Sequence, residues 1–246
     1  MKNYKNLYIN GCSFTAGHEL DDKYIWPNLL SKELNVNLIN QAKNGQSFES
    51  IVYNSVNHLC NLKPSETLVI IGITWPERYL VNVDNFNFNI TPADLGKDKT
   101  TWGDKTSTWR RISTPLTTDQ YEMDDMHFKL NEENIFKILT SYKKYYETLV
   151  KYSSTLEYDQ KLKQNYLLIM LQSFLKTHKF NYRFIGFDAD DKLFGTQFDI
   201  KPFKKFDKKK YIFFNYKNVC NRDGTSHPTK ECCIKIKDTI LKSLNG

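Results

Sequence analysis

A serine near the N-terminus and a loop near the C-terminus carry residue types that can together perform nucleophilic catalysis. Ser13 follows an apolar run at residues 7–9, and Gly11 precedes it, a pattern typical of a buried strand that ends in a tight turn. Asp223 and His227 share one loop. A serine hydroxyl is a poor nucleophile until a base takes its proton, and a carboxylate can orient a histidine for that task. These residues therefore predict a hydroxyl nucleophile with an imidazole base.

Each of these residues also has an ordinary structural interpretation. Ser13 can cap a helix, Asp223 can form a turn beside Gly224, and His227 can lie in a loop at the start of a helix. We favour the catalytic interpretation because loops that follow parallel strands gather at one edge of a sheet. Residues far apart in the sequence can meet there.

The elements that must position these residues alternate between strands and helices. Amphipathic spacing predicts helices over residues 24–34 and 48–62, and apolar runs predict strands over 36–40 and 67–73 after the first strand. This order predicts a parallel sheet with right-handed crossovers. Further elements are expected as helices at 131–149, 158–176 and 228–244 and as strands at 180–187 and 211–216.

The chain is expected to form a single domain over residues 1–246. Its 246 residues, of which 40% are hydrophobic, are enough for one substantial core. Residues 82–126 show no sustained period and are too many for an ordinary connection. We therefore expect an insertion after the third strand, near the sheet edge where ligands bind in such folds.

The charge of the chain narrows the range of partners. The formal net charge is +7, but the lysines are spread along the sequence, and the one dense cluster lies within residues 201–210. Such a run is most often a solvated loop, so nucleic acid binding is not expected and polyanion binding is a minor hypothesis. No metal constellation and no glycine-rich phosphate loop is present in the sequence, and no cofactor is expected.

The cysteines and the apolar segments predict a reduced, cytoplasmic protein. The five cysteines form no CxxC pair and no metal-ligand spacing, which favours free thiols. No signal peptide opens the sequence, and the longest apolar segment, residues 166–175, is too short to span a membrane.

Four stretches of the sequence resemble, in order, the motifs of the SGNH or GDSL-like hydrolase family. They are residues 11–17 (GCSFTAG), 40–47 (NQAKNGQS), 70–75 (IIGITW) and 223–228 (DGTSHP), and they spread over nearly the whole chain. The resemblance implies a three-layer α/β/α sandwich of flavodoxin-like type with a mainly parallel central sheet. It also implies that Ser13 is the nucleophile, with His227 and Asp223 as its partners.

The resemblance further implies an oxyanion hole, and here the chain departs from the family pattern. The amides of Ser13 and Gly45 would hold the oxyanion, but the usual asparagine of the third motif is absent, and Thr74 is the residue that could replace it. Loss of one such donor costs about 10²- to 10³-fold in rate. Asp223 and His227 are also separated by three residues, where the family has two.

The resemblance implies an ester substrate, and three residues are candidates for binding it. His18, Trp75 and Arg78 follow the first and third motifs, and Arg78 can bind an anionic group bidentately or pair with Glu77. We expect an esterase or carbohydrate O-deacetylase that acts on a small acyl group. The alternative is a catalytically impaired scaffold that binds a carbohydrate or a protein. The sequence does not predict an oligomeric state.

Overall fold

Five parallel strands form the central sheet of the protein. The computed structural model describes the chain except for residues 1–3, 18–19, 75–78, 84–85, 91–155, 189–205, 216–226 and 246. The strands lie in the order β2-β1-β3-β6-β7, which is the flavodoxin-like order. Their bounds are Asn6–Asn10 for β1, Asn37–Asn40 for β2, Thr67–Ile73 for β3, Asn181–Asp188 for β6 and Tyr211–Asn215 for β7.

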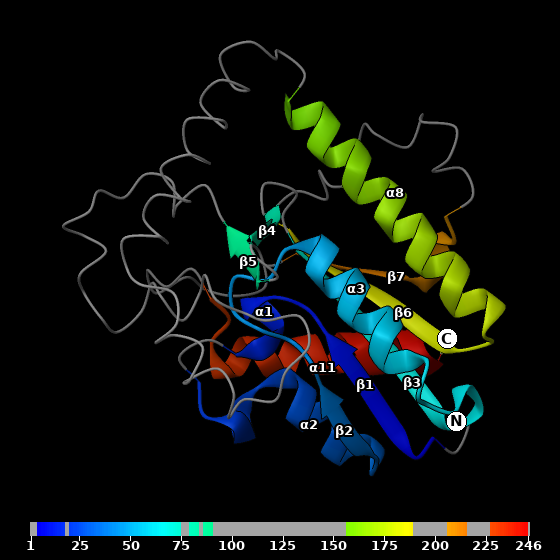
Figure 1. Ribbon diagram of the computed structural model, residues 1–246. Coiled ribbons are helices and arrows are strands. Elements are labelled where there is room, and N and C mark those ends of the chain that lie inside the picture. Colours follow the sequence, from blue (N-terminus) through cyan, green and yellow to red (C-terminus); the bar gives the residue numbers. More distant parts are fainter. Residues whose placement is uncertain are drawn as a thin grey trace.

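Helices cover both faces of this sheet (Figure 1). Helices α2 (Trp26–Leu34) and α11 (Lys230–Asn245) pack on one face, and α3 (Phe48–Leu59) and α8 (Leu156–Thr177) pack on the other. The three-layer α/β/α architecture with a parallel sheet is therefore confirmed.

Strand β3 shows how alternate side chains fill the two cores. All seven of its residues are buried. Leu68 and Ile70 pack with the α2 and α11 layer, whereas Val69 and Ile71 pack with the α3 and α8 layer. A strand covered on both faces needs an unbroken apolar run, which is why this strand is the clearest in the sequence.

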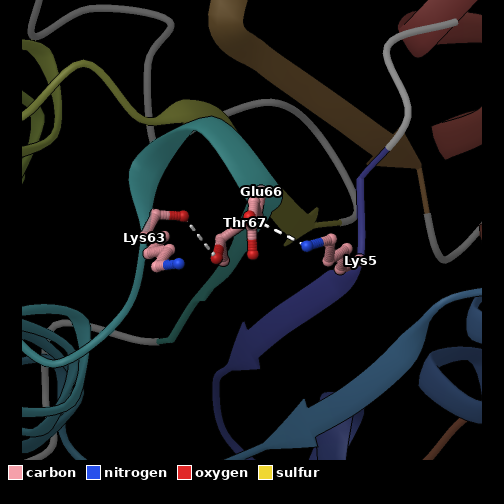
Figure 2. Close-up of polar contacts among 4 residues, drawn as sticks. All are labelled: Lys5, Lys63, Glu66 and Thr67. Carbon is pink, nitrogen blue, oxygen red and sulfur yellow. Dashed lines mark hydrogen bonds and ion pairs between the residues drawn. The ribbon is translucent and has the colours of Figure 1, made fainter.

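Polar contacts fix the N-terminal ends of β1 and β3 side by side. The Lys5 amide donates to the Glu66 carbonyl oxygen at 2.8 Å, and Lys5 Nζ lies 3.0 Å from Glu66 Oε1. The Thr67 hydroxyl donates to the Lys63 carbonyl at 2.9 Å, as Figure 2 shows. The hydrogen bond from Lys5 lowers the pKa of the partly exposed Glu66 carboxyl. Because β1 and β3 are aligned at their N-terminal ends, their C-terminal ends also lie side by side.

In one region the structure contains strands that were not predicted from the sequence. A two-stranded antiparallel hairpin, β4 (Tyr79–Val83) and β5 (Phe86–Ile90), spans the place where the aperiodic insertion was expected to begin. The rest of the expected insertion and the helix expected at 131–149 lie outside the described residues. Short 3-10 helices also occur: η1 (Asp22–Tyr24), η2 (Pro64–Glu66) and η5 (Lys208–Lys210).

Two glycines allow a short helix to pack against the ends of β1 and β3. This helix, α1, spans Ser13–Ala16. A Cβ atom on Gly11 would lie 2.3 Å from Thr15 Oγ1, and one on Gly72 would lie 2.5 Å from the same atom. Thr15 therefore occupies the space that side chains at these two positions would need.

We predict that Gly72→Ala lowers the free energy of unfolding by about 1 to 3 kcal/mol, because the new methyl group overlaps with the stiff Thr15 side chain. The cost should be smaller in a Thr15→Ala background, where the overlapping atom is gone. Denaturant unfolding of the four proteins of this cycle measures the coupling. Equal costs in both backgrounds would contradict the packing described.

Candidate active site

Ser13 is held in a short helix at the C-terminal edge of the sheet. Strand β1 ends at Asn10, and Ser13 begins α1 three residues later with only 4% of its surface exposed. The helix ends after one turn at Gly17, whose φ of 75° is in the left-handed region and whose amide donates to the Ser13 carbonyl. Glycine suits this position because it adopts positive φ without strain.

A buried polar network fixes the turn between β1 and this helix. The Asn10 side-chain amide donates to the Ile51 carbonyl at 3.2 Å and to Ser55 Oγ at 3.1 Å, both on α3. Its oxygen accepts from the Gly11 amide at 2.8 Å. Tyr8 joins the network, and burial raises the pKa of its hydroxyl to about 12. The chain therefore leaves β1 in a direction set by α3.

His227 meets Ser13 across the site. His227 Nε2 lies 3.0 Å from Ser13 Oγ, although the two residues are 214 positions apart in the sequence. His227 is half-buried, and buried Pro228 follows it. Thr229 then caps α11, because its hydroxyl accepts from the Cys232 amide at 3.3 Å. The start of α11 therefore fixes the loop end that carries the imidazole.

Aromatic packing holds the imidazole ring from one side. The Phe14 ring lies 5.6 Å from the His227 ring, centroid to centroid, at an angle of 49°. Phe14 in turn contacts Phe187 of β6 at 5.6 Å, and Phe187 contacts Phe214 of β7 at 6.3 Å. Phe14, which directly follows Ser13, thus links the His227 ring to the sheet.

The loop that follows β2 crosses the end of β1. The Gln41 amide donates to the Ile9 carbonyl at 2.8 Å, and the Lys43 amide donates to the Gly11 carbonyl at 3.2 Å. A turn then closes by the bond from the Gln46 amide to the Lys43 carbonyl at 3.4 Å, with Gly45 at a φ of 74°. Both sides of this turn are anchored, since α3 begins directly after it.

Among the described residues, the backbone hydrogen bonds at this edge of the sheet include none that is donated by the amides of Ser13 and Gly45. Backbone N–H groups that are shielded from water are almost always paired in folded proteins. Free amides on two loops that meet at one edge of the sheet are typical of a place prepared for an anionic oxygen.

Thr74 directly follows β3, at the same edge of the sheet as the turn after β1. Asn10, the last residue of β1, pairs with Ile71 in the sheet register. Thr74 is 1% exposed, and its hydroxyl has no hydrogen-bond partner among the residues that the structure describes. Its carbonyl accepts from the side-chain amide of Gln164 on α8. The backbone at Thr74 is therefore fixed, and the hydroxyl is available.

Of the residues singled out in the sequence, Ser13 and His227 are in direct contact, and Gly45 and Thr74 lie on segments that follow β2 and β3 at the same edge of the sheet. The other four, His18, Trp75, Arg78 and Asp223, lie outside the described residues.

Three contributors to the site were not anticipated from the sequence. Phe14 contacts the His227 ring, Gln164 fixes the Thr74 carbonyl, and the Lys43 amide anchors the glycine turn. The sequence gives a weak indication of a role for Gln164, because it is a polar residue that is buried within an amphipathic helix. The other two are contacts between distant segments, which no local pattern reveals.

The expectation of five reduced thiols is wrong, because one described cysteine forms a disulfide. Cys232, in the first turn of α11, is disulfide-bonded. Cys12, Cys60 and Cys233 are free, and burial raises the pKa of the Cys233 thiol to about 11.

Two other kinds of feature are absent from the described part of the chain. It contains no group of three or more histidine, cysteine, aspartate or glutamate side chains placed to hold a metal ion. None of its helices combines the length and the apolar character needed to cross a membrane.

No protein-family model matches the chain, and no curated protein matches it. Solved structures are similar to it at low identity. Psychrotrophic esterase EstA from Pseudoalteromonas sp. is 12% identical, with coverage of 98% of this chain and 97% of that chain and a TM-score of 0.49. A lipolytic protein of the G-D-S-L family from Veillonella parvula is 12% identical, with 96% coverage of each chain and a TM-score of 0.46. AlinE4, an SGNH-hydrolase family esterase, is 12% identical, with coverage of 100% and 97% and a TM-score of 0.40.

The likeness is weak, and the fold of this chain stands on its own strand order and helical layers.

We predict that Gly45→Ala lowers the free energy of unfolding by about 1 to 2 kcal/mol, because a Cβ atom strains the left-handed backbone at this position. Gly45→Asn is the matched control, since asparagine tolerates this conformation better, and it should cost less. Thermal and denaturant unfolding measure both variants. An asparagine variant that is less stable than the alanine variant would contradict the turn geometry.

Proposed function

We propose that this protein is a serine hydrolase that cleaves esters through an acyl-enzyme on Ser13, with His227 as the general base. The observation that carries the proposal is the 3.0 Å contact between Ser13 Oγ and His227 Nε2. A nucleophile and its base must lie within hydrogen-bond reach, and this contact meets that requirement.

The first half of the proposed reaction acylates the serine. His227, in the tautomer with its proton on Nδ1, accepts the Ser13 hydroxyl proton at Nε2 while Oγ forms a bond to the ester carbonyl carbon. The carbonyl oxygen becomes the oxyanion of a tetrahedral intermediate. His227 then gives the proton to the alcohol oxygen, the carbon–oxygen bond to the alcohol breaks, and the acyl group remains on Ser13.

The second half releases the acid by the same steps with water. His227 takes a proton from a water molecule as the water oxygen attacks the acyl carbon. The tetrahedral intermediate collapses, the bond from carbon to Ser13 Oγ breaks, and the proton returns to Ser13. Protonated imidazole cannot start either half, so the proposed activity falls at acidic pH.

Three donors would hold the oxyanion in this mechanism. The free amides of Ser13 and Gly45 are two of them, and the Thr74 hydroxyl is the third. Donors that are fixed in advance stabilise the developing charge without reorganisation during the reaction. Thr74 would take the part that the family assigns to the asparagine of its third motif.

The proposed substrate is an ester of a small acyl group, and carbohydrate O-acetyl esters are one class to test. This part of the proposal comes from the resemblance in sequence motifs. The role of Asp223 in orienting His227, and the roles of His18, Trp75 and Arg78 in binding substrate, belong to the same proposal. The contact between Ser13 and His227 favours catalysis over a scaffold that only binds a carbohydrate or a protein.

The test is hydrolysis of 4-nitrophenyl acetate and acetylated sugars by the native protein and by Ser13→Ala and His227→Ala. We expect each variant to lose at least about 10³-fold in kcat/KM while remaining folded. Ser173→Ala, which removes an exposed serine hydroxyl on α8, is the control and should keep native rates. A Ser13→Ala protein as active as the native one would overturn the proposal.

We also predict that Thr74→Val lowers kcat by about 10²- to 10³-fold, because it removes one oxyanion donor and keeps the shape of the side chain. Its free energy of unfolding should be unchanged or higher, since the Thr74 hydroxyl makes no hydrogen bond among the described residues. Tyr182→Phe removes another buried hydroxyl without a described partner and is the control for stability alone. A Thr74→Val variant with the native kcat would exclude Thr74 as an oxyanion donor.

A further inference from the structure

Lys43 lies on the same loop as one of the proposed oxyanion donors. Its amide donates to the carbonyl of Gly11, two residues before Ser13. Its carbonyl closes the turn that holds Gly45. The backbone of Lys43 is therefore anchored over the end of β1, at the edge where substrates bind in open parallel sheets.

The charge of this lysine is not balanced within the described part of the chain. Lys43 is half-buried, and no described carboxylate or carbonyl accepts a hydrogen bond from its ammonium group. Burial lowers the pKa of Lys43, since desolvation disfavours the charged form, and no acidic neighbour opposes this effect. Charges that are partly removed from water are normally paired in proteins, because the loss of hydration is otherwise not recovered.

From these observations we propose that Lys43 binds a negatively charged group of the substrate, so that the protein prefers esters that carry a carboxylate near the scissile bond. This inference rests on the proposed function and adds the class of substrate to it. A lysine is suited to this task because its ammonium group is a compact charge on a long stem that can follow the ligand.

The ordinary alternative is that the stem of Lys43 covers apolar surface while its ammonium group remains in water. The two explanations differ in what methionine would do at this position. Lys43→Met keeps an apolar stem of similar length and removes the charge. It therefore leaves packing in place and abolishes only the recognition of an anion.

The experiment measures ligand binding in a Ser13→Ala background, where turnover does not interfere. The probes are two matched pairs of esters. On the acyl side, 4-nitrophenyl hemiglutarate carries a carboxylate and 4-nitrophenyl valerate does not. On the alcohol side, 3-acetoxybenzoate carries a carboxylate and phenyl acetate does not. Calorimetric titration gives each dissociation constant in the presence and absence of Lys43→Met, with Lys32→Met, at an exposed position on α2, as the charge-matched control.

We expect at least one carboxylate ester to bind about 10- to 100-fold more tightly than its neutral partner, as a charge-assisted hydrogen bond provides. Lys43→Met should remove this preference, and Lys32→Met should keep it. No preference for either carboxylate, or a preference that survives Lys43→Met, would overturn the inference.

Measurements of ester hydrolysis distinguish a failure of this inference from a failure of the proposed function. Ser13-dependent hydrolysis of neutral and anionic esters at equal rates, with no effect of Lys43→Met, leaves the hydrolase proposal standing and rejects the role of Lys43. The opposite result is also possible: carboxylate binding depends on Lys43, but the protein with Ser13 intact hydrolyses no ester. That result supports the anion site and rejects the hydrolase proposal.

Discussion

The close packing of helix α1 against the ends of β1 and β3 is the constraint on which the site depends. It requires that Gly11 and Gly72 lack side chains, because Thr15 fills the space beside both. The turn of the chain at Gly11 is held by Asn10, which is itself bonded to α3. Through these contacts the sheet and its α3 layer determine where the Ser13 hydroxyl lies.

Polar groups without described partners occur on the segments that follow β1, β2 and β3. The amides of Ser13 and Gly45 and the hydroxyl of Thr74 lack partners among the described residues, and so does the Lys43 ammonium group. Folding alone disfavours such a group where it is buried, as the Thr74 hydroxyl is, since it has given up water without a replacement. An ester whose carbonyl oxygen becomes negative, and which carries a carboxylate, would supply acceptors for all four.

Part of the fold follows from the sequence because the central strand β3 is buried on both faces. The unbroken apolar run at 67–73 could be recognised as a central strand, and its observed bounds are the same. The hairpin of β4 and β5 was not predicted, because the alternation in Phe86–Ile90 is short and lies in an asparagine-rich region. The helix expected at 48–62 ends at Leu59, near the limit of what periodicity can resolve.

The site was predictable where it depends on topology. Parallel strands carry their following loops to one edge, so Ser13 and His227 could be expected to meet. The contact of Phe14 with His227 depends on how distant segments pack, and no local pattern encodes it. The disulfide of Cys232 was missed because cysteine spacing alone favoured free thiols. The role of Asp223 stays a prediction.

The central claim is that Ser13 is an activated nucleophile, and covalent labelling tests it most directly. The folded protein is treated with a serine-directed fluorophosphonate, and the adduct is located by peptide mass mapping. The account predicts one adduct, on Ser13, that is lost in His227→Ala, since the base activates the hydroxyl. A folded protein in which Ser13 stays unmodified, or is modified equally without His227, would contradict the account.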